Sequence, residues 1–313
     1  MEDKGGKRLA RNRADAARND TAQGKMPAAD VPESGAAPVQ QSRWKRLWSD
    51  YGYLLVTLAV VPFKVEYLIY TVLLIASMLS GYFDDASETA WNEYKKGLID
   101  FVIAVVAGVT YLNFNGTSVN FLSTTFTIAY PLYLLLIVIL IWASINVVNC
   151  TDGVDGLAAS TTMPVCIFFA VLSILWGERF LSLGVFASGI AGGLLGFLIY
   201  NFNPAKVFMG DTGSLFLGGA VAALAFAYDM PLILVTVGIM YIVEALSDII
   251  QVGYFKLTHG KRVFKMSPFH HHLEMGGWTG HKWKEKQIVA LFAGVTVLFA
   301  VLSFIGVFHR FGA

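Results

Sequence analysis

The chain has 313 residues, of which 56% are hydrophobic and only 14% are charged. This composition is too apolar for a soluble domain, and the chain is too long for a single membrane anchor. We therefore expect an all-α fold, a polytopic bundle of transmembrane helices. The net charge of +1 says little by itself, and we expect no nucleic acid among the partners.

Residues 1–47 differ from the rest of the chain. They are rich in Ala, Arg, Lys, Asp, Gly and Pro and contain almost no bulky apolar residues. A segment of this kind buries too little apolar surface to become ordered, so it predicts a disordered polar tail. The transmembrane domain should then occupy residues 48–313.

Nine apolar runs follow the tail, and we interpret each as a membrane span. Several are shorter than the roughly 20 residues that a perpendicular helix needs, so they should extend into the flanking polar residues. The first is the weakest, because Pro62 and Lys64 end it early. The runs cover residues 51–63, 67–83, 98–112, 126–148, 157–176, 180–200, 213–228, 230–255 and 288–308.

The distribution of Lys and Arg predicts the orientation of these spans, because cytoplasmic segments carry an excess of both. With the tail inside and the spans alternating, 20 of the 23 basic residues lie inside. Without the tail the ratio is still 10 to 3. Residues 111–122 then lie outside, where Asn115 and Gly116 predict a small hairpin. The four polar clusters described next all lie at the cytoplasmic face.

Asp84 and Asp85 end the second apolar run. Ionisable groups at membrane depth are costly and usually functional. Adjacent carboxylates also repel each other, so both ionise readily only beside a cation or in water. The pair is therefore either a solvated helix end or a site for Mg²⁺ or a general base, since hard carboxylates suit Mg²⁺.

Asp152 and Asp155 are three residues apart and should lie on one side of the first turn of the next helix. Acidic residues there also complement the helix dipole, which would be a purely structural role. Asn146 and Asn149 precede them and add amide groups. Because amides and carboxylates can match the donors and acceptors of a nucleobase, this cluster favours nucleotide binding.

Asp211 enters a predicted helix within the sequence FMGDTGS at 208–214. Its structural interpretation is an N-cap, a role that Asp performs well. However, Phe208 is an aromatic residue on a polar loop and could stack on a base. The glycines around Asp211 would let backbone amides hold a phosphate at the start of the helix. We therefore favour a functional role for this segment.

His270, His271 and His272 lie in the basic loop KRVFKMSPFHHHLE at 261–274. Three consecutive histidines can indicate a transition-metal site, but no cysteine or acidic cluster completes a ligand set at a recognised spacing. A cationic loop that contacts phosphates is the favoured interpretation.

Glu244, Asp248 and Gln251 form a stripe along one face of the run 230–255. Acids four residues apart would be destabilising in lipid, so the stripe should face a cavity or a protein partner. It is either the wall of the same site or the ion site of a transporter.

Four segments together resemble the polyprenyl-phosphate N-acetylhexosamine-1-phosphate transferase family, from about Tyr67 to the C-terminus. Each motif alone is moderately specific, whereas four in the family's order are strongly so. The histidine loop at 261–278 resembles the branch whose donor carries N-acetylmuramoyl-pentapeptide. The four segments are GYFDD at 81–85, NCTDGVDGLA at 149–158, NFNPAKVFMGDTGS at 201–214 and PFHHHLE at 268–274.

The resemblance implies a reaction of bacterial peptidoglycan synthesis. Phospho-N-acetylmuramoyl-pentapeptide would pass from its UDP-linked donor to undecaprenyl phosphate, giving lipid I and UMP, with Mg²⁺ as cofactor. The protein would be a multi-pass component of the bacterial plasma (inner) membrane, in contact with membrane lipid, with its active site on the cytoplasmic face and a homodimer as its assembly. A transferase for a UDP-N-acetylglucosamine-type donor is one alternative, and a non-catalytic or transport paralogue is the other.

The resemblance also implies roles for individual residues. Asp84, assisted by Asp85, would be the base or orienting group for the lipid phosphate, and Asp211 would be catalytic and bind Mg²⁺. His270 would be the fourth catalytic residue and would contact phosphate together with Lys96. The implied substrate-binding residues are Lys96, Asn146, Asn149, Asp152, Asp155, Asn201, Phe208, Gln251, His271 and His272.

The chain departs from the family's pattern in two places. Family members have ten spans and an early cytoplasmic Lys-x-Gly-Thr-Pro-x-x-Gly-Gly stretch, whereas this chain has nine apolar runs and lacks that stretch. A polar tail stands in place of the first span and loop, and the missing loop would contribute to the nucleotide pocket. Residues 86–94 also differ from the family, which bears on the role assigned to Lys96.

Overall fold

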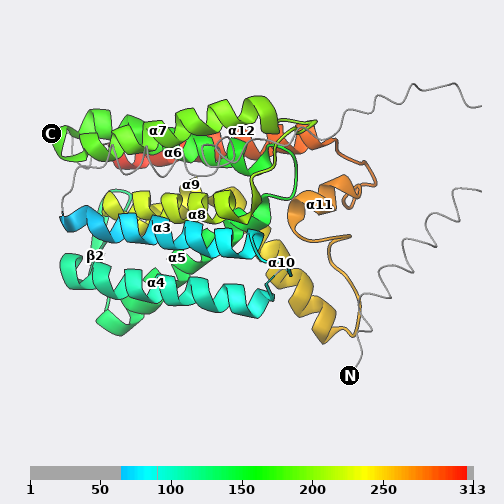
Figure 1. Cartoon of the computed structure of the whole chain (residues 1–313), viewed down its shortest axis with the longest axis horizontal. Helices are drawn as coiled ribbons and strands as arrows, with labels where there is room; N and C mark the ends of the chain where they lie inside the picture. The colour runs from blue at the N-terminus through cyan, green and yellow to red at the C-terminus, as the bar shows by residue number, and fades with distance from the viewer. Residues whose placement is uncertain (1–64, 90, 309–313) are drawn as a thin grey trace, which may run out of the picture. The chain divides into compact units, whose positions relative to one another are not determined.

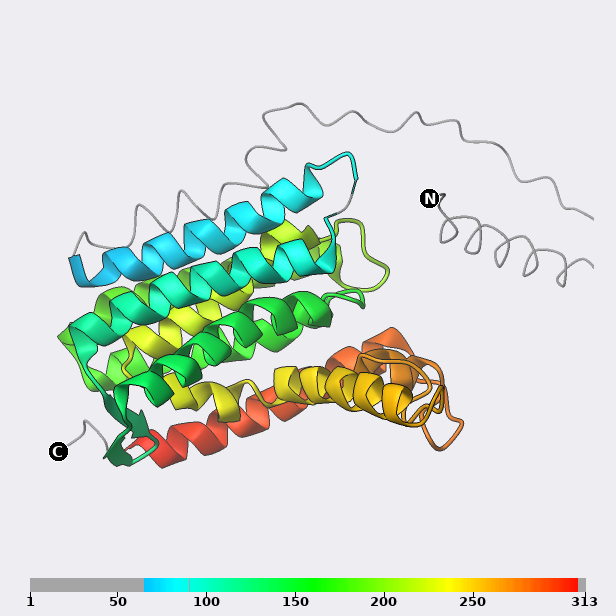
Figure 2. The same cartoon turned by 90° about the horizontal axis from the view of Figure 1, so that it is seen from below.

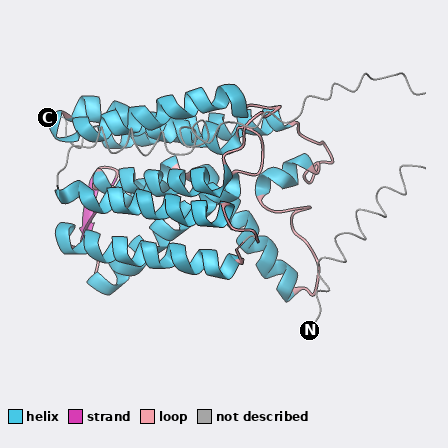
Figure 3. Ribbon diagram, viewed as in Figure 1, coloured by secondary structure: helices cyan, strands magenta, loops and turns pink. Residues whose placement is uncertain are grey.

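The computed structural model describes residues 65–89 and 91–308. The predicted tail at 1–47 and the first predicted span at 51–63 lie outside these residues. The described part of the chain is mainly helical, as Figure 3 shows, with one small pair of strands.

Seven helices of the described residues are long and apolar enough to cross a membrane, so the chain is a multi-pass membrane protein. They run side by side in Figures 1 and 2. Each coincides with one of the predicted runs. They are α3 (Val65–Asp85), α4 (Glu93–Asn115), α5 (Tyr130–Thr151), α6 (Leu157–Trp176), α7 (Glu178–Asn201), α8 (Gly210–Ala227) and α12 (Glu285–Val307).

The predicted run 230–255 is not one continuous helix. It consists of the 3-10 turn η2 (Pro231–Ile233), the short helix α9 (Leu234–Val237) and α10 (Ile239–Leu257), with a bend of 82° at the break. Gly238 lies at the break, where its N–H still bonds to the carbonyl of Leu234. In Figure 1, α10 runs obliquely to the other long helices. The bend lets one face of α10 turn towards the histidine loop, as described below.

The predicted hairpin exists, but its turn lies elsewhere than expected. Strands β1 (Ser118–Phe121) and β2 (Thr124–Thr127) pair antiparallel, with Ser118 opposite Thr127, so the turn is at 122–123. Gly116 instead ends α4 with a φ of 71°, a left-handed conformation that suits glycine at a helix end. The expected turn at Asn115 and Gly116 is therefore wrong.

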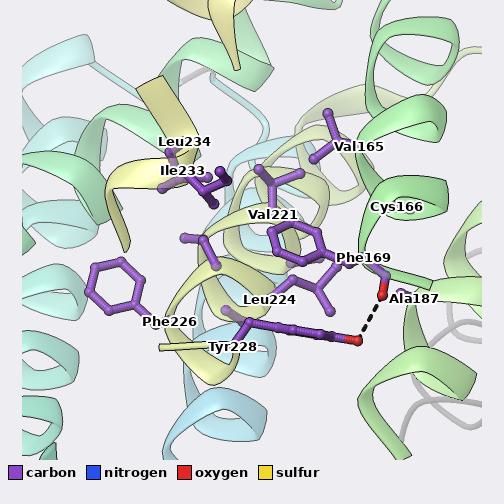
Figure 4. Packing of buried hydrophobic residues seen from close by; sticks show 14 of the residues in the cluster. Val165, Cys166, Phe169, Ala187, Val221, Leu224, Phe226, Tyr228, Ile233 and Leu234 are labelled. Atoms are coloured by element: carbon purple, nitrogen blue, oxygen red, sulfur yellow. Dashed lines mark hydrogen bonds between the residues drawn. The ribbon is translucent and has the colours of Figure 1, made fainter. Parts of the chain in front are cut away.

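Helices α6 and α8 form the centre of the bundle. In each, 72% of the membrane window is buried by protein, against 33% in α4, α5 and α12. Figure 4 shows part of this core, where Val221 and Leu224 of α8 pack beside Phe169 of α6. The hydroxyl of Tyr228, just after α8, donates to the carbonyl of Phe169 at 2.8 Å. The polar group of this buried tyrosine is thereby satisfied.

Small residues let α8 approach its neighbours closely. A Cβ at Gly218 would lie 2.6 Å from the backbone of Ile145 on α5. A Cβ at Gly219 would lie 2.9 Å from the hydroxyl oxygen of Ser77 on α3. Close approach through small residues is a common way of packing helices in membranes. It brings the start of α8 beside the ends of α3 and α5.

Candidate functional site

The first turn of α8 is capped by a carboxylate from another helix. Asp85, the last residue of α3, accepts hydrogen bonds from the backbone N–H groups of Asp211 and Thr212 at 3.1 and 2.8 Å, and from the hydroxyl of Thr212 at 2.6 Å. The first N–H groups of a helix have no partner within it, and a carboxylate there also complements the dipole. Asp211 itself lies in the first turn, after the cap residue Met209, so the N-cap interpretation of Asp211 is wrong.

The carboxylates of Asp84 and Asp211 meet at one lysine. The Nζ of Lys96, on α4, lies 2.6 Å from an oxygen of Asp84 and also contacts an oxygen of Asp211. The second oxygen of Asp84 accepts the backbone N–H of Trp91 at 2.7 Å. The second oxygen of Asp211 accepts the side-chain amide of Asn149 at 2.7 Å. Four predicted site residues, one from each of α3, α4, α5 and α8, therefore form a single cluster.

Asp152 and Asp155 lie in the connection between α5 and α6, and not in the first turn of α6, which begins at Leu157. That part of the prediction is wrong. Asp155 accepts the backbone N–H of Ala205 at 2.8 Å, so it holds the connection between α7 and α8 in place. Burial, reinforced by the charges of Asp211 and Asp85, raises the pKa of Asp152 to about 7. The charge of Asp152 is thus coupled to the charges of Asp211 and Asp85.

The connection between α7 and α8 contributes two predicted residues. Asn201 is buried; its amide nitrogen donates to the carbonyl of Val207 at 2.9 Å, and its amide oxygen has no partner among the described residues. Phe208 is 75% exposed, as a ring that stacks on a ligand would be. Asn146 is less suited to binding, because its amide donates to the carbonyl of Trp142 one turn back on α5, at 2.9 Å, and also interacts with the carboxylate of Asp100.

The first histidine of the loop is held by a buried glutamate. His270 lies on α11 (Phe269–Glu274), and both it and Glu244 of α10 have no exposed surface. Its backbone N–H and its Nδ1 bond to the two carboxylate oxygens at 3.2 and 2.9 Å. Because a carboxylate oxygen accepts, Nδ1 carries the hydrogen. The remaining Nε2 has no partner in the described part of the chain and lies against Gly153, where a Cβ would overlap it.

The other two histidines have different surroundings. His271 bonds through Nδ1 to Glu274 at 2.6 Å and is partly exposed. His272 is buried, and its Nδ1 accepts the backbone N–H of Lys265 at 3.1 Å. Burial and the charge of Lys265 both lower the pKa of His272, which favours the neutral ring. The favoured interpretation of a cationic loop therefore does not extend to the ring of His272.

The stripe on α10 faces this loop. The amide oxygen of Gln251 accepts the N–H groups of Val263 and Phe264 at 3.1 and 3.0 Å, and its nitrogen donates to the carbonyl of Phe264 at 3.2 Å. These bonds engage Gln251 in holding the loop. The geometry therefore does not support the substrate-binding role predicted for it, whereas the prediction that the stripe faces protein is confirmed.

One buried residue next to the cluster was missed in the sequence. Asp100 lies on α4, one turn beyond Lys96, and has no exposed surface. One of its oxygens accepts the hydroxyl of Ser80 at 2.8 Å. The signal that could have found it is an acid four residues after a lysine, inside an apolar run.

The donor set fits a magnesium ion. Asp84 and Asp211 each direct one oxygen at the same ammonium group, so a cation is already held between them. No group of three or more His, Cys, Asp or Glu side chains suited to a metal occurs within the described residues. Mg²⁺ is commonly held by only one or two carboxylates together with substrate phosphates, so two carboxylates are sufficient.

The chain matches the family model of glycosyl transferase family 4 over residues 67–229. Among curated proteins it is 47% identical, over 67% of this chain, to the phospho-N-acetylmuramoyl-pentapeptide-transferase of Clostridium acetobutylicum. It is 41% identical, over 80% of the chain, to the protein of that name from Clostridium botulinum, strain Eklund 17B. It is also 41% identical, over 81% of the chain, to that of Shouchella clausii.

These matches cover much of each relative. The chain spans 65% of the Clostridium acetobutylicum protein, just under two thirds of its length, and 78% of the other two. The matched residues include the cluster formed by Asp84, Lys96, Asn149 and Asp211. The chain therefore belongs to glycosyl transferase family 4 and, within it, to the family of the phospho-N-acetylmuramoyl-pentapeptide-transferases.

Proposed function

We propose that the chain transfers phospho-N-acetylmuramoyl-pentapeptide from its UDP-linked donor to undecaprenyl phosphate, releasing UMP and forming lipid I. The observation that carries the proposal is the convergence of Asp84, Lys96, Asn149 and Asp211 from four helices. Charged groups at the end of an apolar bundle are suited to a reaction between a water-soluble phosphate ester and a lipid phosphate.

Mg²⁺ is the proposed cofactor, held by Asp211 with Asp84. When bound, it would neutralise the diphosphate of the donor and stabilise the UMP that leaves. Asp85 would act indirectly, because its bonds to the start of α8 fix the position of Asp211. Asn149 fixes the Asp211 carboxylate in the same way.

In this proposal an oxygen of undecaprenyl phosphate attacks the phosphorus that bears the sugar, and the bond from that phosphorus to UMP breaks. A phosphate ester is largely ionised at neutral pH, so the nucleophile needs orientation more than deprotonation. Asp84, which the ammonium of Lys96 contacts in the structure, would orient the lipid phosphate. His270 would contact a phosphate through Nε2, with Glu244 holding its ring.

The nucleoside would lie beside the connection between α7 and α8. Phe208 offers an exposed ring for stacking, and the free amide oxygen of Asn201 could accept from the base. Asp152 lies near the carboxylate cluster and could hydrogen-bond to the base, whereas Asp155 would act by holding the loop. His271 is partly exposed and suited to contact with the donor.

The site would face the cytoplasm in a bacterial plasma membrane. Lys206 and the basic residues between 256 and 286 lie in the connections at the same ends of the helices as Asp84 and Asp211. An excess of Lys and Arg marks the cytoplasmic side. That side is where a soluble UDP-linked donor would meet a lipid acceptor. The proposed homodimer would be tested by the mass of the purified protein in detergent.

The deciding experiment measures UMP release in detergent with undecaprenyl phosphate and each of two donors, with and without Mg²⁺. We expect release only with the N-acetylmuramoyl-pentapeptide donor and only with Mg²⁺. Asp211→Asn should lower the rate by about a thousandfold or more while the protein still folds. Release from UDP-N-acetylglucosamine alone would favour the alternative transferase, and saturable nucleotide binding without UMP release would favour a binding or transport role.

A further inference from the structure

Asp100 is a buried carboxylate whose two oxygens differ in how well they are hydrogen-bonded. Its first oxygen accepts the hydroxyl of Ser80 at 2.8 Å, and the side-chain amide of Asn146 on α5 also interacts with the carboxylate, but the second oxygen makes no well-formed hydrogen bond among the described residues. The residue has no exposed surface and lies within the membrane-spanning helix α4. In its charged form, a buried acid in this position is costly unless a cation compensates it. The second oxygen therefore requires an explanation.

The cation within reach is Lys96. It lies four residues before Asp100 on the same helix, a spacing that places two side chains next to each other. Its four-carbon stem is flexible, so its ammonium group can move between nearby acceptors. The adjacent Lys95 is not an equivalent candidate, because it is exposed and its Nζ lies 3.6 Å above the ring of Trp91.

Lys96 and a divalent cation need the same carboxylate oxygens. The ammonium contacts one oxygen of Asp84 and one of Asp211, the pair to which magnesium is assigned above. Two cations a few ångströms apart repel strongly in a partly buried site. Binding of the metal therefore requires the ammonium to leave, and it must leave towards another anion or remain unpaired.

We propose that Lys96 is a movable counterion with two binding positions, and that Asp100 is the second. Asp100 would receive the ammonium when a divalent cation binds Asp84 and Asp211, so it is a positioning residue for the metal site. The hydroxyl of Ser80 fixes one oxygen of Asp100 and leaves the other for the ammonium. The inference rests on the magnesium site proposed above.

The consequence is a specific dependence of metal affinity on both residues. The ammonium competes with the metal, so Lys96→Met should tighten metal binding. Asp100→Asn removes the second position, so the ammonium stays in competition and metal binding should weaken by about tenfold, the size expected for losing a partly buried ionic partner. In the Lys96→Met background there is no ammonium to relocate, so Asp100→Asn should then change the affinity by less than about twofold.

The experiment is Mn²⁺ binding to the purified full chain in detergent, followed by electron paramagnetic resonance. The variants are Lys96→Met, Asp100→Asn, both together, and Lys95→Met as the matched control, which should bind with an affinity within about twofold of wild type. Equal weakening by Asp100→Asn in both backgrounds would show that Asp100 acts only through its own charge and would overturn the proposal. No weakening in either background would also overturn it.

Two further measurements separate the possible failures. If wild type and Asp211→Asn bind Mn²⁺ equally, the metal site itself is wrong and both proposals fall. If Asp100→Asn does not elute as a folded protein, wild type labelled at the lysine Cε carbon with ¹³C decides. The signal lost in Lys96→Met should shift when Mg²⁺ is added, while the Lys95 signal stays in place. An unmoved Lys96 signal would contradict the relocation.

Discussion

Glu244→Ala should be among the most damaging single changes in the chain. Glu244 has no exposed surface, and its two carboxylate oxygens accept the backbone N–H and the Nδ1–H of His270 at 3.2 and 2.9 Å. Alanine removes both acceptors at once. The two donors lie where the described structure offers them no other partner and water has little access.

The magnitude follows from the two unpaired donors. Each buried donor left without a partner costs about 1–3 kcal/mol, so the free energy of unfolding should fall by about 2–6 kcal/mol. The His270 ring also loses the bond that sets its orientation, and such supporting bonds are typically worth about 10–100-fold in activity. Equilibrium unfolding in mixed micelles measures the first effect, and UMP release measures the second.

Asp248→Ala is the matched control for this change. It removes an acid from the same helix one turn later, but Asp248 is partly exposed and its side chain hydrogen-bonds to Ser267, not to His270. A hydrogen bond of this kind contributes about 0.5–1.5 kcal/mol, so the control should lose less stability than Glu244→Ala. If Glu244→Ala and Asp248→Ala lower the stability equally, the bonds between Glu244 and His270 do not hold the histidine loop, and the reasoning is wrong.

Three further changes test other parts of the structure. Gly81→Ala places a Cβ against the backbone at the start of α8, so it should lower stability by about 1–3 kcal/mol and reduce activity. Gly196→Ala, whose Cβ meets open space, should change neither stability nor activity. Equal thermal stability of the two variants would contradict the close packing at Gly81. The pKa of Asp152 is raised to about 7 from 3.8, so wild type should lose stability as the pH rises through this interval. Asp152→Asn should therefore be more stable than wild type at pH 8 but not at pH 4. If the melting temperatures of the two proteins differ equally at both pH values, this titration is excluded. Asn120→Ala removes the 3.1 Å hydrogen bond to the backbone carbonyl of Asp229 and should lower the unfolding free energy by about 1–3 kcal/mol. UMP release should not change, because the hairpin lies at the ends of the helices opposite the carboxylate cluster. An equal loss of activity would show that the two ends are coupled.

The helical spans could be predicted from the sequence because the physical rule behind them is local. A run of apolar residues in lipid must satisfy its backbone hydrogen bonds internally, and a helix does so within the run itself. The run 230–255 was the exception, since its helix breaks at Gly238, whereas Glu244 and Gln251 lie within the continuous helix α10. Period and composition identify a helix there, but the bend depends on what the stripe packs against.

The amino-acid sequence by itself determined the helical class, the position of most spans and the polar clusters at their ends. Only the tertiary structure decided which residue of each cluster contacts which partner. Asp85 caps α8 while Asp84 meets Lys96, and Gln251 holds a loop while Glu244 holds His270. Two adjacent acids, or adjacent histidines, look alike in the sequence, so the pattern does not tell their roles apart. Which one reaches a partner depends on side-chain directions across helix contacts, and no spacing along one helix contains that information.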